Sequence, residues 1–190
     1  HKSDFGSVDN LINNSKGCGG VMRAAPVGLF NLKKRLTIEE TDLIAAEAAA
    51  LTHGPPLGYI PAAGLAHIVR RTAQEDMPLD NAVADMIKVV GRMFARWDET
   101  NTFTALMNEA VRLAKGDTPD IDAIHRLGEG WVGDEALAIA DRIVILDDHS
   151  VKKGYPIGSA WRARATAEDR HALRQAILSS IETTKNEKET

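Results

Sequence analysis

Apolar residues recur three and four positions apart along most of the chain, which is the spacing of one face of an α-helix. The segment 81–97 shows this spacing most fully. Its apolar positions are Val83, Met86, Ile87, Val90, Met93 and Phe94. A second segment, 38–52, is rich in alanine and follows the capping box Thr37-Ile-Glu-Glu40, which is typical of a helix start. Both segments are therefore predicted to be helices that share a core.

Stop signals separate these helices from others with the same spacing. Gly54-Pro55-Pro56 ends the helix at 38–52, because proline cannot continue the hydrogen-bond ladder, and Gly116 ends another. The predicted helices are 38–52, 60–73, 81–97, 103–115, 121–127, one that starts near residue 132 and one that follows the capping box at 166–169. Ile143-Val144-Ile145 is too short to indicate a strand. The fold class predicted is all-α, a multi-helix bundle.

Composition narrows the class of protein. A chain of 190 residues with 44% hydrophobic residues can form one sizeable core. The net charge of −4 gives no reason to expect nucleic acid or an anionic membrane as a partner, and no apolar run is long enough to span a bilayer. Cys18 is the single cysteine, so an internal disulfide is excluded and a reducing, cytoplasmic location is expected. Because the chain starts with His1 rather than Met, we expect it to begin inside a longer reading frame.

The stretch 13–30 holds the strongest candidate for a binding loop. Gly17, Gly19 and Gly20 fall within four positions, which frees the backbone for positive φ and lets main-chain N–H groups approach a phosphate or diphosphate. The apolar and small residues from Val21 to Phe30 are expected to form a buried anchor under this loop. A glycine loop alone is also compatible with a plain turn.

Three motifs make the interpretation more specific. The run 15–26, Ser-Lys-Gly-Cys-Gly-Gly-Val-Met-Arg-Ala-Ala-Pro, resembles the Gly-Asn-Gly-Gly-x-Met-Arg-x-Ala-Pro signature of the ADP-ribosylglycohydrolase family, with Cys18 where that family has Asn. Leu51-Thr52-His53 resembles the Thr-His segment that follows in that family. The run 128–140, Gly-Glu-Gly-Trp-Val-Gly-Asp-Glu-Ala-Leu-Ala-Ile-Ala, resembles its third motif. The resemblance thus covers about residues 13–140 in the family's order.

This resemblance implies a function. The family's members are all-α enzymes that hydrolyse the glycosidic bond between ADP-ribose and a protein side chain or small acceptor, using two magnesium ions. The implied ADP-ribose-binding residues of this chain are Ser15, Gly17, Cys18, Gly19 and His53. Ser15 and the glycine N–H groups would hold phosphate, and His53 would add a phosphate or ribose contact. The alternative is a helix-terminal histidine that interacts only with the helix dipole, and the first motif favours the ligand contact.

The metal ligands that the family implies are not recognised in this chain. One family motif, of the Thr-Asp-Asp type, would lie before His1, and the other has the form Asp-x-Asp-Ser/Thr. The acidic pairs at 120–122 and 147–148 have the wrong position or order for it. We therefore expect Mg²⁺ to belong to the intact family member, no catalytic residue is assigned, and this chain alone is expected to be inactive. A truncated family domain at 1–140 and a divergent segment at 141–190 with one terminal helix are predicted.

Other functions and residue roles stay open at this point. The expected partner is ADP-ribose or an ADP-ribosylated protein, but a non-catalytic ADP-ribose-binding protein and a crystallin-like structural protein are the alternatives. Arg23 is placed either on a phosphate or in a pair with a carboxylate under the loop. Trp131 and Leu137 are expected in the core or in the lining of an adenosine pocket, and Glu135 could tie the start of its helix to a neighbour. His67 and His125 are predicted to be surface or packing positions.

Overall fold

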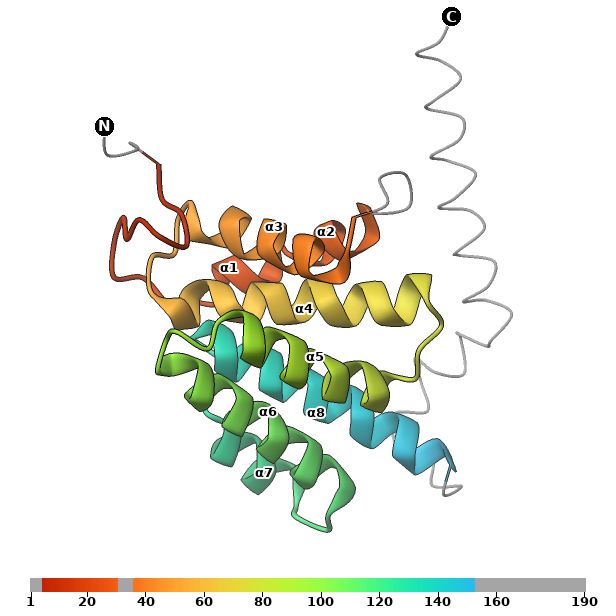
Figure 1. The fold of residues 1–190 in the computed structure, drawn as a ribbon. Helices are drawn as coiled ribbons and strands as arrows, with labels where there is room; N and C mark the ends of the chain where they lie inside the picture. Colours follow the sequence, from red (N-terminus) through yellow and green to blue (C-terminus); the bar gives the residue numbers. More distant parts are fainter. Residues whose placement is uncertain (1–4, 31–35, 153–190) are drawn as a thin grey trace, which may run out of the picture. The chain divides into compact units, whose positions relative to one another are not determined.

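The computed structural model of the chain describes residues 5–30 and 36–152, and within them it is helical (Figure 1). The helices are α1 Gly19–Met22, α2 Ala25–Phe30, α3 Ile38–Ala50, α4 Pro56–Gln74, α5 Leu79–Met93, α6 Glu99–Lys115, α7 Asp120–Leu127 and α8 Gly133–Lys152. The described residues form no strand beyond isolated bridges, so the all-α prediction is confirmed. The helix predicted after residue 166 and the link at 33–35 lie outside the described residues.

The chain divides into two units, 1–149 and 150–190, and the structure below is that of the first. A domain boundary after residue 140 stays a prediction, and α8 continues through that point to Lys152. Across the described helices, none is long and apolar enough to cross a bilayer.

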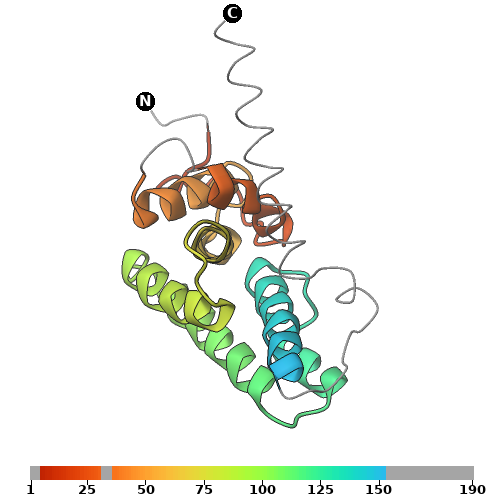
Figure 2. The same ribbon diagram turned by 90° about the vertical axis from the view of Figure 1, so that its right-hand side faces the viewer.

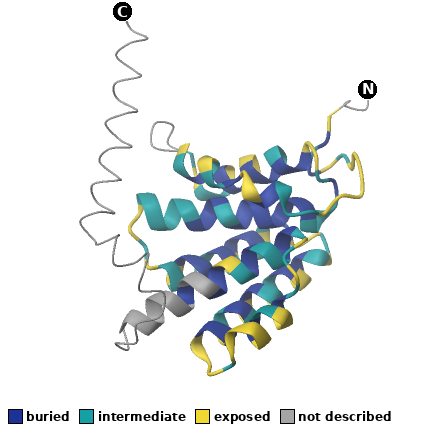
Figure 3. Cartoon of the chain, turned by 180° about the vertical axis from the view of Figure 1, so that it is seen from behind, coloured by how far each residue is buried: buried dark blue, intermediate teal, exposed yellow. Residues whose placement is uncertain are grey.

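Helix α4 is the centre of the first unit. It contacts α1, α2, α3, α5 and α6, and Figure 2 shows it end-on between the α1–α3 helices and the later ones. Small buried residues allow this close packing, since a Cβ on Gly64 would lie 3.0 Å from Phe103 and 3.2 Å from Leu137. Figure 3 shows the buried positions concentrated along α4 and the helices beside it. The apolar face predicted for 81–97 is part of this core, with Val83, Met86 and Val90 fully buried.

Helix α4 begins four residues earlier than the predicted 60–73. Pro55 and Pro56 follow the preceding helix, and Pro56 also starts α4, because the first helical residue needs no N–H partner. Pro61 consequently lies inside the helix and cannot donate to the Leu57 carbonyl one turn earlier. Gly133 packs against that carbonyl, where a Cβ would lie 3.1 Å from the oxygen. This irregularity lets the start of α8 approach α4 closely.

Three further helix ends differ from the sequence prediction. Helix α5 ends at Met93 rather than at residue 97, and α6 begins at Glu99 rather than at 103. Helix α8 passes through Ile143-Val144-Ile145 and the following acidic residues, where no helical spacing was recognised. The buried positions of α8 explain the missed signal, because two of them, Asp141 and Arg142, are charged and interrupt the apolar face.

A buried histidine joins three helices. His67 of α4 is fully buried, with Nδ1 2.7 Å from an Asp42 oxygen of α3 and Nε2 3.1 Å from an Asp85 oxygen of α5. Arg71 also pairs with Asp85 at 2.7 Å. Burial raises the pKa of Asp42; it also acts to raise that of Asp85, but hydrogen bonds and charges from His67 and Arg71 leave the Asp85 pKa below its usual value. His67 is therefore a packing position with polar partners, whereas His125 is exposed.

The buried face of α8 carries a second unusual group. The Asp141 side chain is buried, and its Oδ2 has no hydrogen-bond partner among the described residues. Burial raises the pKa of Asp141 to about 7. The neighbouring Arg142 is directed to Asp120 of α7, with Nη2 2.7 Å from the carboxylate. Among the described side chains, Asp141 has no ion pair with a cation.

Candidate functional site

The glycine loop has a different conformation from the predicted one. Gly19 and Gly20 form the start of α1, and among the described glycines positive φ occurs at Gly128 and Gly130 instead. The prediction of positive φ at Gly17, Gly19 and Gly20 is therefore wrong. What requires glycine at position 20 is close packing, because a Cβ there would lie 2.5 Å from the Gly58 carbonyl oxygen of α4.

The loop pairs with the segment before α8. The Cys18 N–H donates to the Trp131 carbonyl at 3.0 Å, and the Gly133 N–H donates to the Lys16 carbonyl at 3.0 Å. Gly17 and Val132 face each other in this antiparallel bridge, so the N–H and carbonyl of Gly17 point away from Val132. The first and third sequence motifs, more than a hundred residues apart, therefore form one structural unit.

Asn13 fixes the entry to the loop. Its side-chain amide donates to the Thr52 carbonyl at 2.9 Å, while its side-chain oxygen accepts from the N–H groups of Ser15 at 2.9 Å and Gly54 at 3.1 Å. Asn13 is not among the residues predicted to bind ADP-ribose. An Asn two positions before a Ser in a glycine-rich stretch is a turn signal that could have indicated it.

His53 lies against the glycine loop. Its backbone N–H donates to the Ala49 carbonyl at 3.0 Å, just past the end of α3. Its ring Nε2 would be 3.3 Å from a Cβ on Gly19 and 3.9 Å from one on Gly17. Burial and then the Arg23 charge lower the pKa of His53, so the ring is neutral at neutral pH. The structure thus brings together His53, Gly17 and Gly19.

Arg23 lies beside Thr52 and His53 rather than in a pair with a carboxylate, and its contact with a phosphate stays a prediction. Its Nη2 donates to the Thr52 hydroxyl and lies 3.4 Å from the Ala49 carbonyl and 3.5 Å from Nδ1 of His53. The structure records no carboxylate partner for it in the described part of the chain. Arg23 is exposed, and its guanidinium lies at the Nδ1 side of the His53 ring, whereas Nε2 faces the glycine loop.

The other predicted binding residues are at the loop but differ in what they can offer. Ser15 is exposed, and its Oγ would be 3.8 Å from a Cβ on Gly17. Cys18 is half-buried, and because its N–H is taken by Trp131, only its side chain is left to contact a ligand. Trp131 is 76% exposed, so its expected place in the core is wrong.

The remaining motif residues are structural. Leu137 is buried in the core. Glu135 accepts from the N–H groups of Glu129 and Gly130, both at 3.1 Å, so the predicted tie at the start of its helix is confirmed. The predicted anchor from Val21 to Phe30 is only partly buried, because Met22 and Phe30 are exposed.

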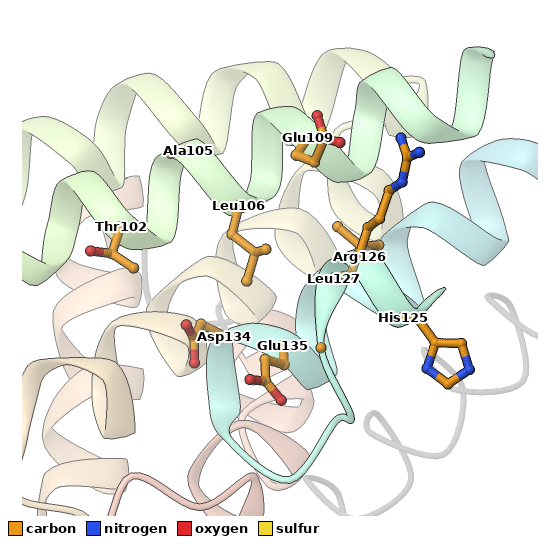
Figure 4. Close-up of a pocket in the computed structure, with 10 residues that line it drawn as sticks. Thr102, Ala105, Leu106, Glu109, His125, Arg126, Leu127, Asp134 and Glu135 are labelled. Atoms are coloured by element: carbon orange, nitrogen blue, oxygen red, sulfur yellow. The ribbon is translucent and has the colours of Figure 1, made fainter. Parts of the chain in front are cut away.

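A separate hollow of about 530 Å³ lies between α6, α7 and the start of α8 (Figure 4). Its lining includes Leu106, Leu127 and Asp134, and none of the predicted ADP-ribose-binding residues. Asp134 is 5% exposed, its Oδ1 has no partner in the described part of the structure, and burial raises its pKa. Gly128, Asp134 and Glu135 of the third motif line this hollow, whereas the glycine loop and His53 do not.

The carboxylates were tested as ligands for the two magnesium ions that the family implies. Among the side chains that the structure describes, no three from His, Cys, Asp or Glu come close enough to hold a metal ion. Asp120 of the pair at 120–122 is paired with Arg142, and the side chains of Asp147 and Asp148 lie outside the described part. The described carboxylates do not fit a two-magnesium centre.

Comparison with protein families agrees with the motifs and the fold. The sequence model of the ADP-ribosylglycohydrolase family matches residues 2–179, which is most of the chain and extends beyond the 13–140 covered by the resemblance. The chain belongs to the ADP-ribosylglycohydrolase family. Searches of curated proteins and of solved structures return no match.

Proposed function

We propose that the loop at 15–19 and His53 form the diphosphate-binding part of an ADP-ribose site. The observation that carries this proposal is the position of the His53 Nε2 against Gly17 and Gly19. Because Gly17 and Gly19 have no Cβ atoms, a phosphate beside the loop can approach both its main chain and the His53 ring. The Gly17 N–H, directed away from Val132, is a main-chain donor at the same place.

Trp131 is the proposed contact for the adenosine part of the ligand. Its backbone is fixed to the loop through Cys18, while its side chain is 76% exposed. An exposed indole beside a phosphate site offers a flat apolar face, on which a purine base can stack. The Trp131 face and the Gly17 loop would thereby bind two ends of one nucleotide.

The function that we propose is binding of the family's ADP-ribosyl group, without its hydrolysis. Members of the family act on ADP-ribosylated substrates, and the intact enzymes hydrolyse the glycosidic bond to the acceptor. For this chain we propose binding of the ADP-ribosyl group, free or attached to protein, without hydrolysis by the chain alone. The acceptor, whether arginine, serine or a small molecule, is not part of the proposal.

The test is a calorimetric titration of the 190-residue chain with ADP-ribose, in the presence and absence of magnesium. Micromolar binding is expected in both conditions. Gly19→Val is expected to weaken binding by at least about tenfold, because the added side chain occupies the space beside the His53 ring. Gly116→Val is the matched control, since Gly116 has an extended backbone at the end of α6, far from the loop in the fold.

The outcomes separate the candidate functions. Binding without release of ADP-ribose from an ADP-ribosylated protein supports the recognition proposal, and such release by the chain contradicts its restriction to binding. A folded chain that ignores ADP-ribose would contradict the proposal and favour a structural role of the crystallin-like kind. Equal loss of binding in the Gly19→Val and Gly116→Val variants would place the site elsewhere.

A further inference from the structure

The contacts at Nδ1 of His53 determine which ring nitrogen carries the proton. The Thr52 hydroxyl accepts from Arg23, so its own proton must be donated elsewhere. Two acceptors are within reach: Nδ1 of His53 at 2.8 Å and the Ala49 carbonyl at 3.5 Å. The shorter contact, to Nδ1, is the better hydrogen bond.

Arg23 favours the same arrangement. Its guanidinium can only donate, and its Nη2 lies 3.5 Å from the same ring nitrogen. A proton on Nδ1 would therefore face a donor and a positive charge. Thr52 and Arg23 can both donate to Nδ1 when this nitrogen is an acceptor. In a neutral imidazole the proton is then on Nε2.

We propose that Arg23 and Thr52 are positioning residues that hold His53 as the Nε2–H tautomer, so that the ring presents an N–H donor to the glycine loop. This inference rests on the proposed function for its consequence, which is that the ligand group at this point is an acceptor such as a phosphate oxygen. The tautomer itself is inferred from the contacts of Thr52 and Arg23 with Nδ1 and does not depend on the proposed function.

The arrangement selects for an anion by combining two effects. The Nε2–H adds a directed donor to those of the loop. The positive charge of Arg23 lies 3.5 Å from the other ring nitrogen, Nδ1, and attracts an anion as well. A neutral imidazole keeps its donor without depending on protonation, because burial and the Arg23 charge lower the pKa of His53. A ligand group that needs a hydrogen-bond donor from the protein is accepted, and one that must itself donate is not.

The experiment is two-dimensional NMR of the ¹⁵N-labelled full chain at about pH 8, where neutral histidines predominate. The His53→Gln variant identifies the His53 ring signals. Wild-type His53 is expected to show the protonated-nitrogen shift at Nε2, and Thr52→Val is expected to bring a mixture of both tautomers. Thr52→Ser should restore the wild-type pattern, because it retains the hydroxyl.

Arg23→Met supplies a second, independent readout. Removing the charge is expected to raise the pKa of His53 in a pH titration and to weaken ADP-ribose binding by about tenfold. Circular dichroism confirms that each variant is folded. Protonation of Nδ1 in the wild type, or a tautomer and pKa unchanged in both the Thr52→Val and Arg23→Met variants, would overturn the inference. If the wild type shows the Nε2–H tautomer but no ADP-ribose binding, the positioning role stands and the proposed function fails.

Discussion

His67→Ala is expected to lower the free energy of unfolding by about 3–5 kcal/mol, because it removes one partner of a buried ionic network. Asp42, on α3, is fully buried and would lose its 2.7 Å contact, while Asp85 would keep only Arg71. Burial already raises the pKa of Asp42, and His67 opposes this rise more strongly than the Arg70 charge does, so removing the imidazole removes most of the compensation. Denaturant unfolding followed by circular dichroism measures the change.

The matched control for this variant is His125→Ala. His125 is also a histidine inside a helix, but it is exposed, so its replacement should change stability by at most about 0.5 kcal/mol. Adding Asp42→Asn to the His67→Ala variant should recover part of the loss, because the unpaired carboxylate is then neutral. Equal effects of the two histidine substitutions, or no recovery, would show that the network does not stabilise the contact of α3, α4 and α5.

Asp141→Asn is expected to raise the free energy of unfolding at pH 8 by about 4 kcal/mol, the equivalent of its pKa change. In the folded chain Asp141 holds its proton up to a pKa of about 7, whereas its ordinary value is 3.8. The folded state therefore binds more protons than the unfolded state between these values. Wild-type stability from this group is full below about pH 4 and falls as the pH rises to about 7. The neutral amide removes this cost of burying a charge.

Unfolding curves at pH 5 and at pH 8 measure the prediction for Asp141→Asn. The difference in stability between variant and wild type should be larger at the higher pH. Asp122→Asn is the control, because Asp122 is an exposed carboxylate on α7 and its replacement should leave the pH dependence unchanged. A stabilisation by Asp141→Asn that is equal at both pH values would contradict burial of an ionised carboxylate as its cause.

Motif spacing identified some residues of the candidate site and missed others. The glycines and His53 were identified because local sequence carries the signal for a loop and for a helix end. Asn13 and the final role of Arg23 were not, since both are defined by contacts with Thr52, about 30 to 40 positions away. The requirement for Gly20 likewise comes from the Gly58 carbonyl of another helix, so its supposed positive φ could not be judged from the loop alone.

The sequence by itself determined the all-α class, most helix positions, the apolar core face of α5 and the family, because helical spacing, capping residues and motifs are properties of short segments. Only the tertiary structure decided which charged groups are buried and what they meet. The sequence does not distinguish His67 from the other histidines, whereas in the structure α3 and α5 each place a carboxylate at one of its ring nitrogens. The start of α4 at Pro56, the length of α8 through Asp141 and the pairing of Gly17 with Val132 also depend on packing between distant segments, which no local pattern records.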